Sequence, residues 1–329
     1  MIIRQIYRRQ SRVLFSAVRP TFQPSRYLLT QTETPQPTVQ IEKSPTEDEV
    51  ETLENKLQAA EQFENAMTRR NQFNKFGSKI LGKYLPDDLL NNPPRPSEIT
   101  LEILLASQTH LGHATALWNP RNSSYIFGIR EGIHIISLEV TAAYLRRAAK
   151  IVEEVSRRGG LVLFVGTREN QSRAVVRAAE LAKGYHVFTR WVPGSITNGE
   201  QLLKGCALKV VDEFDNQLPQ YDENLKNKPV LRPDLVVCLN PMENVVLLRE
   251  CRAYNIPTIG VIDTDADVTR VTYPIPANDD SIRSITLIAG VLGRAGEAGQ
   301  KRRFEETKAG KLPYTRISED EIMKDPFSI

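Results

Sequence analysis

The chain has 329 residues, 40% of them hydrophobic, and a formal net charge of +3. This length is sufficient for one large or two smaller hydrophobic cores. No apolar run is long enough for a membrane-spanning helix, and three cysteines without a CxxC pair exclude a disulfide framework. The composition therefore predicts a soluble, folded protein.

The first thirty residues are rich in arginine and contain no acidic residue. This composition is typical of a mitochondrial transit peptide, so we predict a leader over residues 1–30 and a mature protein in the mitochondrial matrix. The alternative is a basic arm that stays on the protein and binds RNA. Loss of the six arginines of residues 1–26 changes the net charge from +3 to about −3. Any RNA contact of the mature chain must then come from local basic patches.

Residues 31–96 are expected to form a linker and an N-terminal extension. The segment 30–46 is rich in Thr, Gln and Pro, and the acidic segment 47–67 has apolar residues at spacings of three and four. This periodicity predicts an amphipathic helix too short to be stable alone. We predict that it docks on a neighbouring protein, the alternative being a disordered tail. The proposed docking residues are Val50, Leu53, Leu57 and Met67.

The region 97–300 is expected to be the globular domain, followed by a charged tail over 301–329. Its strands are continuous apolar runs that alternate with helices, which predicts a doubly wound, mostly parallel α/β sheet of the flavodoxin or Rossmann type. The expected helices are 97–108, 139–158, 169–183, 243–254 and one from Ser281. The expected strands are 125–129, 132–138, 161–165, 185–188, 234–239 and 257–263.

Sheets of this kind bind ligands at the carboxyl ends of their strands. The strand 161–165 is followed by Gly166, but neither GxGxxG nor GxxxxGK with Ser or Thr is present. We therefore predict no nucleotide cofactor, although Arg168 and nearby backbone amides could meet an RNA phosphate. The sequence also has no nucleophile elbow and no reactive-cysteine motif. An enzyme on this fold is the less favoured alternative.

Two groups of residues are candidate metal ligands. Asp263, Asp265 and Asp267 have the spacing of a calcium loop but lack its glycine and its closing glutamate. We predict a solvated turn there. His110 and His113 are separated by a glycine, and no cysteine or carboxylate near them in the sequence completes a ligand set. We predict structural histidines that bind backbone or RNA, and no metal.

Trp118 and Trp191 both lie in segments rich in Gly, Pro, Asn and Arg. Arg121, Arg130 and Arg190 accompany them and are candidate phosphate ligands, because loops held by a rigid sheet commonly form binding surfaces. The alternative for the tryptophans is that they anchor the loops by packing.

Several blocks of this sequence resemble the ribosomal protein S2 family. They are HLGH, WNP, YIFGIR and GIHII within 110–136, LVLFVGTR at 161–168, and RW with the following TN within 190–198. The later blocks are RPDLVVCLNP, IPTIGVIDTDAD and YPIPANDDS within 232–281. Together they cover residues 97–300 in the order of the family.

The resemblance implies a structural component of the mitochondrial small ribosomal subunit, placed between head and body near the messenger RNA exit. It implies binding to small-subunit ribosomal RNA and neighbouring small-subunit proteins, without catalysis, cofactor or homo-oligomer. A free assembly factor is the alternative. The expected RNA-binding residues are His113, Trp118, Asn119, Arg121, Tyr125, Arg130, Arg168, Arg190, Trp191, Thr197 and Asn198.

The sequence departs from the bacterial members of the family in two places. The bacterial proteins insert a long helical hairpin after the TN block, whereas only about residues 200–232 separate Asn198 from the next strand. Pro193 replaces a glycine of the WLGG block, which stiffens that loop and changes the expected RNA geometry.

Overall fold

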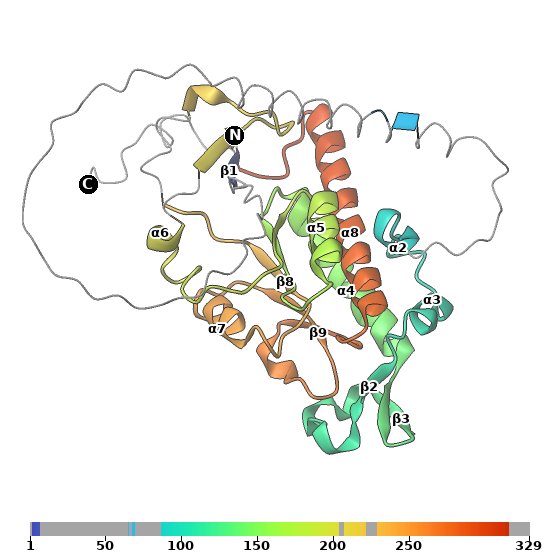
Figure 1. Ribbon diagram of the computed structural model, residues 1–329. Coiled ribbons are helices and arrows are strands. Elements are labelled where there is room, and N and C mark those ends of the chain that lie inside the picture. The colour runs from blue at the N-terminus through green and yellow to red at the C-terminus, as the bar shows by residue number, and fades with distance from the viewer. Residues whose placement is uncertain are drawn as a thin grey trace, which may run out of the picture. The chain divides into compact units, whose positions relative to one another are not determined.

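The computed structural model describes residues 2–6, 65, 68–69, 87–203, 207–221 and 229–315 (Figure 1). The chain divides into two compact units, one of Met1–Gln10 with Leu85–Ile329 and one of Ser11–Tyr84. The four docking residues predicted in segment 47–67, and the leader apart from 2–6, lie outside the described residues. Those two predictions and the boundary at residue 96 therefore stay predictions.

A five-stranded parallel sheet forms the centre of the first unit. Its strand order is β10 (Tyr273–Pro276), β9 (Thr258–Ile262), β8 (Leu235–Cys238), β5 (Val162–Val165) and β6 (Tyr185–Val187). The chain moves outward from β5 first to β6 and then, in the other direction, to β8. The predicted parallel α/β sheet is confirmed, and its topological switch point lies beside β5.

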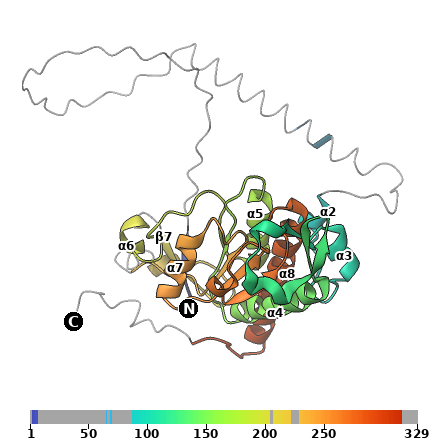
Figure 2. The same cartoon turned by 90° about the horizontal axis from the view of Figure 1, so that it is seen from below.

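Helices cover both faces of this sheet. On one face lie α4 (Leu138–Arg157), α5 (Ser172–Ala182) and α8 (Ile282–Lys308), and on the other lies α7 (Val245–Ala253) (Figures 1 and 2). Side chains alternate between the faces along each strand. Phe164 therefore packs under α4, α5 and α8, while its neighbour Leu163 belongs to the core that includes α7.

The last helix corrects the predicted boundary at residue 300. It starts after Ser281 as expected, but continues to Lys308. Arg303 is fully buried, so the first residues of the expected tail are part of the domain. Glycines let α8 approach α5 closely, since a Cβ at Gly296 would lie 2.5 Å from the Cβ of Ala182.

A small antiparallel sheet projects from the domain, with strand order β2-β4-β3. Its strands are β2 (Leu111–Ala114), β3 (Ile126–Arg130) and β4 (Ile133–Ile136). The 3₁₀ helices η1 (Thr115–Leu117) and η2 (Pro120–Tyr125) lie between β2 and β3. The sequence predicted β3 and β4 but not β2, which has a bulge and lacks a continuous apolar run. Figure 1 shows β2 and β3 on the side of the first unit that is opposite β1.

Two further elements differ from the expectations. The helix predicted over 97–108 is α3 (Leu101–Ala106), because Thr100 caps it by accepting a hydrogen bond from the Ile103 amide. β10 was missed because it contains two prolines. An edge strand tolerates them, since one side of its backbone has no partner.

The remaining elements are short. They are β1 (Ile2–Ile6), which pairs antiparallel with β7 (Ala207–Val211), and α2 (Asp88–Asn91), α6 (Gly199–Leu202), η3 (Pro219–Tyr221) and η5 (Val268–Arg270). Within the described parts of 199–234, no long helical hairpin is present. Among the described helices, none combines the length and apolar character needed to span a bilayer.

Candidate functional site

Polar side chains from two neighbouring strands form a network at the switch point of the sheet. Asn240, after β8, donates to Thr167 Oγ1 and to Glu243 Oε2 at 2.7 Å each. Thr167 follows β5 and donates to Glu243 Oε2 at 2.9 Å, while Asn244 donates to Thr167 Oγ1 at 3.1 Å. These mutual bonds occupy the position where enzymes of this fold bind phosphate groups.

Arg168 extends this network toward a cluster of carboxylates. Its Nε donates to Glu243 Oε1 at 2.7 Å, and its Nη1 donates to Asp280 Oδ1 at 2.5 Å. Asp279 Oδ1 lies 3.1 Å from the same Nη1. Because three carboxylates surround this guanidinium, its attraction for an RNA phosphate is small. Arg168 was among the expected RNA ligands, and its geometry makes it an internal partner instead.

The predicted solvated aspartate turn is wrong for its first residue. Asp263 is 1% exposed, and its carboxylate accepts from the Thr264 amide and, at 3.4 Å, from the Asp279 amide. Asp267 does form the expected turn, capping η5 through the Thr269 amide. The fold also brings His113 to this loop, with Nδ1 3.3 Å from Asp263 Oδ2.

The acidic surroundings change the protonation of two of these groups. The interaction with the Asp263 carboxylate raises the pKa of His113 to about 9, against the opposing effect of burial. Burial raises the pKa of Asp279 to about 7, and the nearby Asp263 and Asp280 carboxylates act in the same direction, opposed by Arg168. Both shifts favour the protonated form, so they partly offset the negative charge of the closely spaced carboxylates at the centre of this sheet edge.

Asn122 holds the small sheet against the loop after β9 and was missed in the sequence. Its Nδ2 donates to the carbonyl oxygens of Asp263, Thr264 and Ala266 at 3.0, 3.2 and 2.7 Å, and the residue is 1% exposed. The neighbouring Asn119, an expected RNA ligand, accepts from the Arg121 amide and caps η2. No sequence pattern distinguishes these two asparagines.

The exposed side chains of the small sheet form one end of the candidate interface. Phe127 is 81% exposed and Ile129 63%, and the Arg130 side chain is 80% exposed. Trp118 packs against the buried His134 with ring centroids 5.5 Å apart, and Tyr125 packs edge-on against Tyr144 at 5.7 Å. Trp118 therefore makes a packing contact, as the alternative expected for the tryptophans requires, but it remains 38% exposed.

Arg121 lies beside this sheet with its side chain 60% exposed. Its Nη1 lies 3.1 Å from Asp267 Oδ1 and donates to Thr269 Oγ1 at 3.2 Å. An exposed ion pair of this kind contributes little stability. The guanidinium is therefore held at the surface, and among the described residues only its Nη1 has hydrogen-bond partners, which leaves donors for a phosphate.

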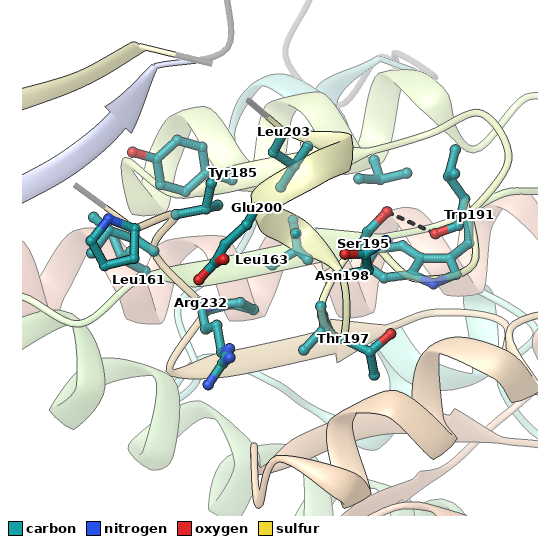
Figure 3. A pocket seen from close by; sticks show the side chains of 18 of the residues that line it. Leu161, Leu163, Tyr185, Trp191, Ser195, Thr197, Asn198, Glu200, Leu203 and Arg232 are labelled. Atoms are coloured by element: carbon teal, nitrogen blue, oxygen red, sulfur yellow. Dashed lines mark hydrogen bonds between the residues drawn. The ribbon is translucent and has the colours of Figure 1, made fainter. Parts of the chain in front are cut away.

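The loop after β6 forms the other end of the candidate interface. Thr197 and Asn198 are exposed, as is Arg190, while Trp191 is partly buried. These residues line a cavity of about 680 Å³ over β5 and β6, where Tyr185 and Trp191 lie at opposite ends (Figure 3). The cavity occupies the part of the sheet face that α7 does not cover.

Glu250 of α7 holds this loop in place. One carboxylate oxygen accepts from the Gly194 amide at 2.7 Å and from Trp191 Nε1 at 3.4 Å, and the other accepts from the Ile196 amide at 3.0 Å. Gly194 has a positive φ of 92°, which glycine adopts at low cost. Glu250 is 7% exposed and was not singled out in the sequence.

We expect Glu250→Gln to loosen the loop, because the new NH2 group must face either the Gly194 or the Ile196 amide. The lost hydrogen bond and the donor–donor conflict should cost about 1–3 kcal/mol locally. Hydrogen exchange of the loop amides should accelerate by at least about tenfold, and the exposed Glu200→Gln is the control. Unchanged protection of the Gly194 and Ile196 amides would show that other contacts hold the loop.

The expected RNA ligands thus fall into three groups. Arg168 and His113 lie among the central carboxylates, and the other nine lie in two flanking segments, 118–130 and 190–198. Both segments belong to the carboxyl edge of the parallel sheet or to the small sheet joined to it. The fold and the carboxyl edge of its sheet indicate the class of protein. It is an α/β scaffold for binding, in which exposed arginines flank an acidic centre.

The chain belongs to the ribosomal protein S2 family, whose model matches residues 104–299. Members of this family are structural components of the ribosome and not enzymes. The predicted family and the predicted absence of an enzymatic role are therefore confirmed.

Individual relatives agree with the family match. A Neurospora crassa protein called small ribosomal subunit protein uS2m is 58% identical over 243 residues, which cover 74% of this chain and 56% of that protein. A Schizosaccharomyces pombe protein of the same name is 44% identical over 262 residues, covering 78% and 98%. The small ribosomal subunit protein uS2 of Desulfatibacillum aliphaticivorans is 33% identical over 224 residues, covering 62% and 76%. The match to the Neurospora relative thus spans little more than half of that protein.

Proposed function

We propose that this chain is a structural component of the mitochondrial small ribosomal subunit, imported with a cleaved leader and acting in translation in the matrix. The family match and the two fungal relatives named small ribosomal subunit protein uS2m support this proposal. The RNA-binding part of this proposal rests on one observation. The exposed segments 118–130 and 190–198, which contain arginines, lie on either side of an acidic centre.

The charge distribution supports binding to ribosomal RNA through the two flanking segments. The central carboxylates repel phosphate, whereas Arg121, Arg130 and Arg190 extend from the flanks. Contacts at two separated points fix the orientation of a protein on RNA, because each guanidinium binds a phosphate through several donors. The partly exposed Trp118 and Trp191 can add stacking on unpaired bases.

Neighbouring proteins are the second class of partner in this proposal. Phe127 and Ile129 form an exposed apolar strip on β3, and such strips commonly mark protein interfaces. The family resemblance favours a place between head and body near the messenger RNA exit. Segment 47–67, with its four predicted docking residues, is the proposed second attachment.

The RNA-binding proposal is tested by replacing Arg121, Arg130 and Arg190 together with alanine. We expect folding to be retained, because the ion pairs that Arg121 and Arg130 form with described residues are exposed and contribute little stability. Incorporation into the small subunit should fall at least about tenfold at moderate salt, and the salt dependence of RNA binding should weaken with each lost phosphate contact. Sedimentation of mitochondrial lysates on sucrose gradients measures the incorporated fraction.

The matched control replaces Arg158, Arg173 and Arg302, whose side chains are 66%, 68% and 53% exposed on the helical side of the domain. Equal incorporation of both triple variants would contradict the assignment of the RNA-facing edge. The same gradients separate the alternative, because an assembly factor sediments only with immature particles and a structural component follows the mature subunit.

A further inference from the structure

One edge of the strand β7 is paired with a segment that the mature protein is proposed to lose. β1 lies antiparallel to β7 along its whole length, from Ile2 opposite Val211 to Ile6 opposite Ala207, and the two strands form a sheet of their own. β1 belongs to the predicted leader of residues 1–30. Cleavage of that leader would therefore uncover one edge of β7.

The other edge of β7 is already occupied by the segment that follows it. The Leu218 amide donates to the Val210 carbonyl oxygen at 3.0 Å. In an antiparallel pair the N–H and C=O groups of one residue point to the same side of the strand, and successive residues alternate. The backbone groups of residues 207, 209 and 211 therefore point toward β1. Without β1, each of these residues would present an unpaired N–H and an unpaired C=O.

The uncovered edge would be held rigidly by the rest of the domain. With β1 in place, Val210 and Val211 are 0% and 1% exposed, so both faces of β7 are packed, since neighbouring side chains point to opposite faces. The segment after β7 is tied to α8, because Arg303 Nη2 donates to both carboxylate oxygens of Asp215 at 2.8 Å. A preorganised edge loses little entropy when a strand is added to it.

An open, rigid strand edge is a binding site for extended peptides, because their backbone continues the ladder of hydrogen bonds. Many proteins protect such edges with charged residues or proline. β7 contains no proline and one charged residue, Lys209. RNA lacks the regularly spaced N–H and C=O groups that the edge requires, so the geometry favours a polypeptide as the occupant.

The charge of Lys209 indicates the kind of segment that would bind. The register places Arg4 of β1 opposite Lys209, and like charges at directly opposed positions weaken a strand pair. β1 is therefore a poor match at this position, whereas an acidic residue would be a good one. The other positions of β7 are apolar, so apolar residues are expected on either side of the acidic one.

We propose that β7 of the mature protein accepts an extended segment of a neighbouring small-subunit protein as an antiparallel strand, with an acidic residue opposite Lys209. This inference rests on the proposed function, because it requires that the leader is cleaved and that the chain has protein neighbours in the subunit. β1 fills the edge only until cleavage, and the mismatch at Lys209 favours its exchange for the partner strand. The attachment uses none of the residues of segments 118–130 and 190–198.

The test uses the chain without residues 1–30, which is the proposed mature form, and a fluorescent peptide of residues 1–8 as a surrogate strand. We expect saturable binding by fluorescence anisotropy and hydrogen-exchange protection of the Lys209 and Val211 amides. The Arg4→Glu peptide should bind at least about threefold more tightly. Lys209→Glu should reverse that preference, whereas Lys150→Glu, at an exposed lysine of α4, should keep it.

Backbone methylation of the peptide distinguishes strand addition from simple charge attraction. The amide of residue 4 points toward β7 because it lies opposite Lys209, whereas the amide of residue 5 points away. N-methylation at residue 4 of the Arg4→Glu peptide should weaken binding at least about tenfold, because it removes a donor and introduces a clash. N-methylation at residue 5 should have little effect. Equal effects of the two methyl groups, or no gain from Arg4→Glu, would overturn the proposal.

The intact subunit provides the second measurement. In purified small subunits the Lys209 and Val211 amides should exchange at least about tenfold more slowly than in the free mature chain. With Leu208 replaced by the photoreactive p-benzoylphenylalanine, a cross-link to another small-subunit protein is expected. Exchange at the rate of the free chain, or a cross-link only to RNA or to this chain itself, contradicts the proposal. Incorporation of the chain into the subunit is measured separately, so failure of the proposed function is a distinct outcome.

Discussion

Replacing Arg303 with methionine is expected to lower the free energy of unfolding by about 3 kcal/mol. The Arg303 side chain is fully buried, and its Nη2 donates to both carboxylate oxygens of Asp215 at 2.8 Å and to Gln300 Oε1 at 2.7 Å. Methionine fills much of the volume but leaves Asp215, 11% exposed, with Lys183 at 3.4 Å as a weaker ion-pair partner. Equilibrium denaturation in urea measures the loss.

The adjacent Arg302→Met is the matched control. The Arg302 side chain is 53% exposed and pairs with Glu153 at 2.7 Å, and an exposed pair of this kind contributes about 1 kcal/mol or less. If the two variants unfold at the same urea concentration, the buried pair does not anchor α8 to the segment after β7. The extension of the domain past residue 300 would then have little energetic importance.

Asn122→Asp is expected to cost about 3–5 kcal/mol, the largest effect of a single substitution near the candidate interface. The amide donates to the carbonyl oxygens of Asp263, Thr264 and Ala266. A carboxylate of nearly the same shape has no hydrogens to donate, and it places a buried negative charge against three carbonyl oxygens. The small sheet should detach from the loop, which urea denaturation and hydrogen exchange of β2 would detect.

Asn119→Asp is the control, because Asn119 uses its side-chain oxygen to accept from the Arg121 amide. Aspartate keeps that acceptor and caps a helix about as well as asparagine. We therefore expect a change within about 0.5 kcal/mol. Similar losses for both variants would show that the three carbonyl contacts of Asn122 do not hold the loop.

Part of the candidate site followed from the sequence. The loops 118–130 and 190–198 were predicted because tryptophan, arginine and asparagine occur there beside glycine and proline, and the structure places their arginines at the surface. Glu250 and Asn122 were missed. Each lies in an ordinary helix or turn and acquires its role only from backbone groups that are distant along the chain.

The sequence alone determined the parallel α/β sheet, the family and the exposed arginine segments, because apolar periodicity and local motifs act over short stretches. Tertiary structure decided the strand order, the extension of α8 through the buried Arg303, and the surroundings of Arg168 and His113. The physical reason is that burial and charge depend on what lies across the fold. Arg168 resembles a free cation along the chain, but the folded protein places it among the carboxylates of Glu243, Asp279 and Asp280.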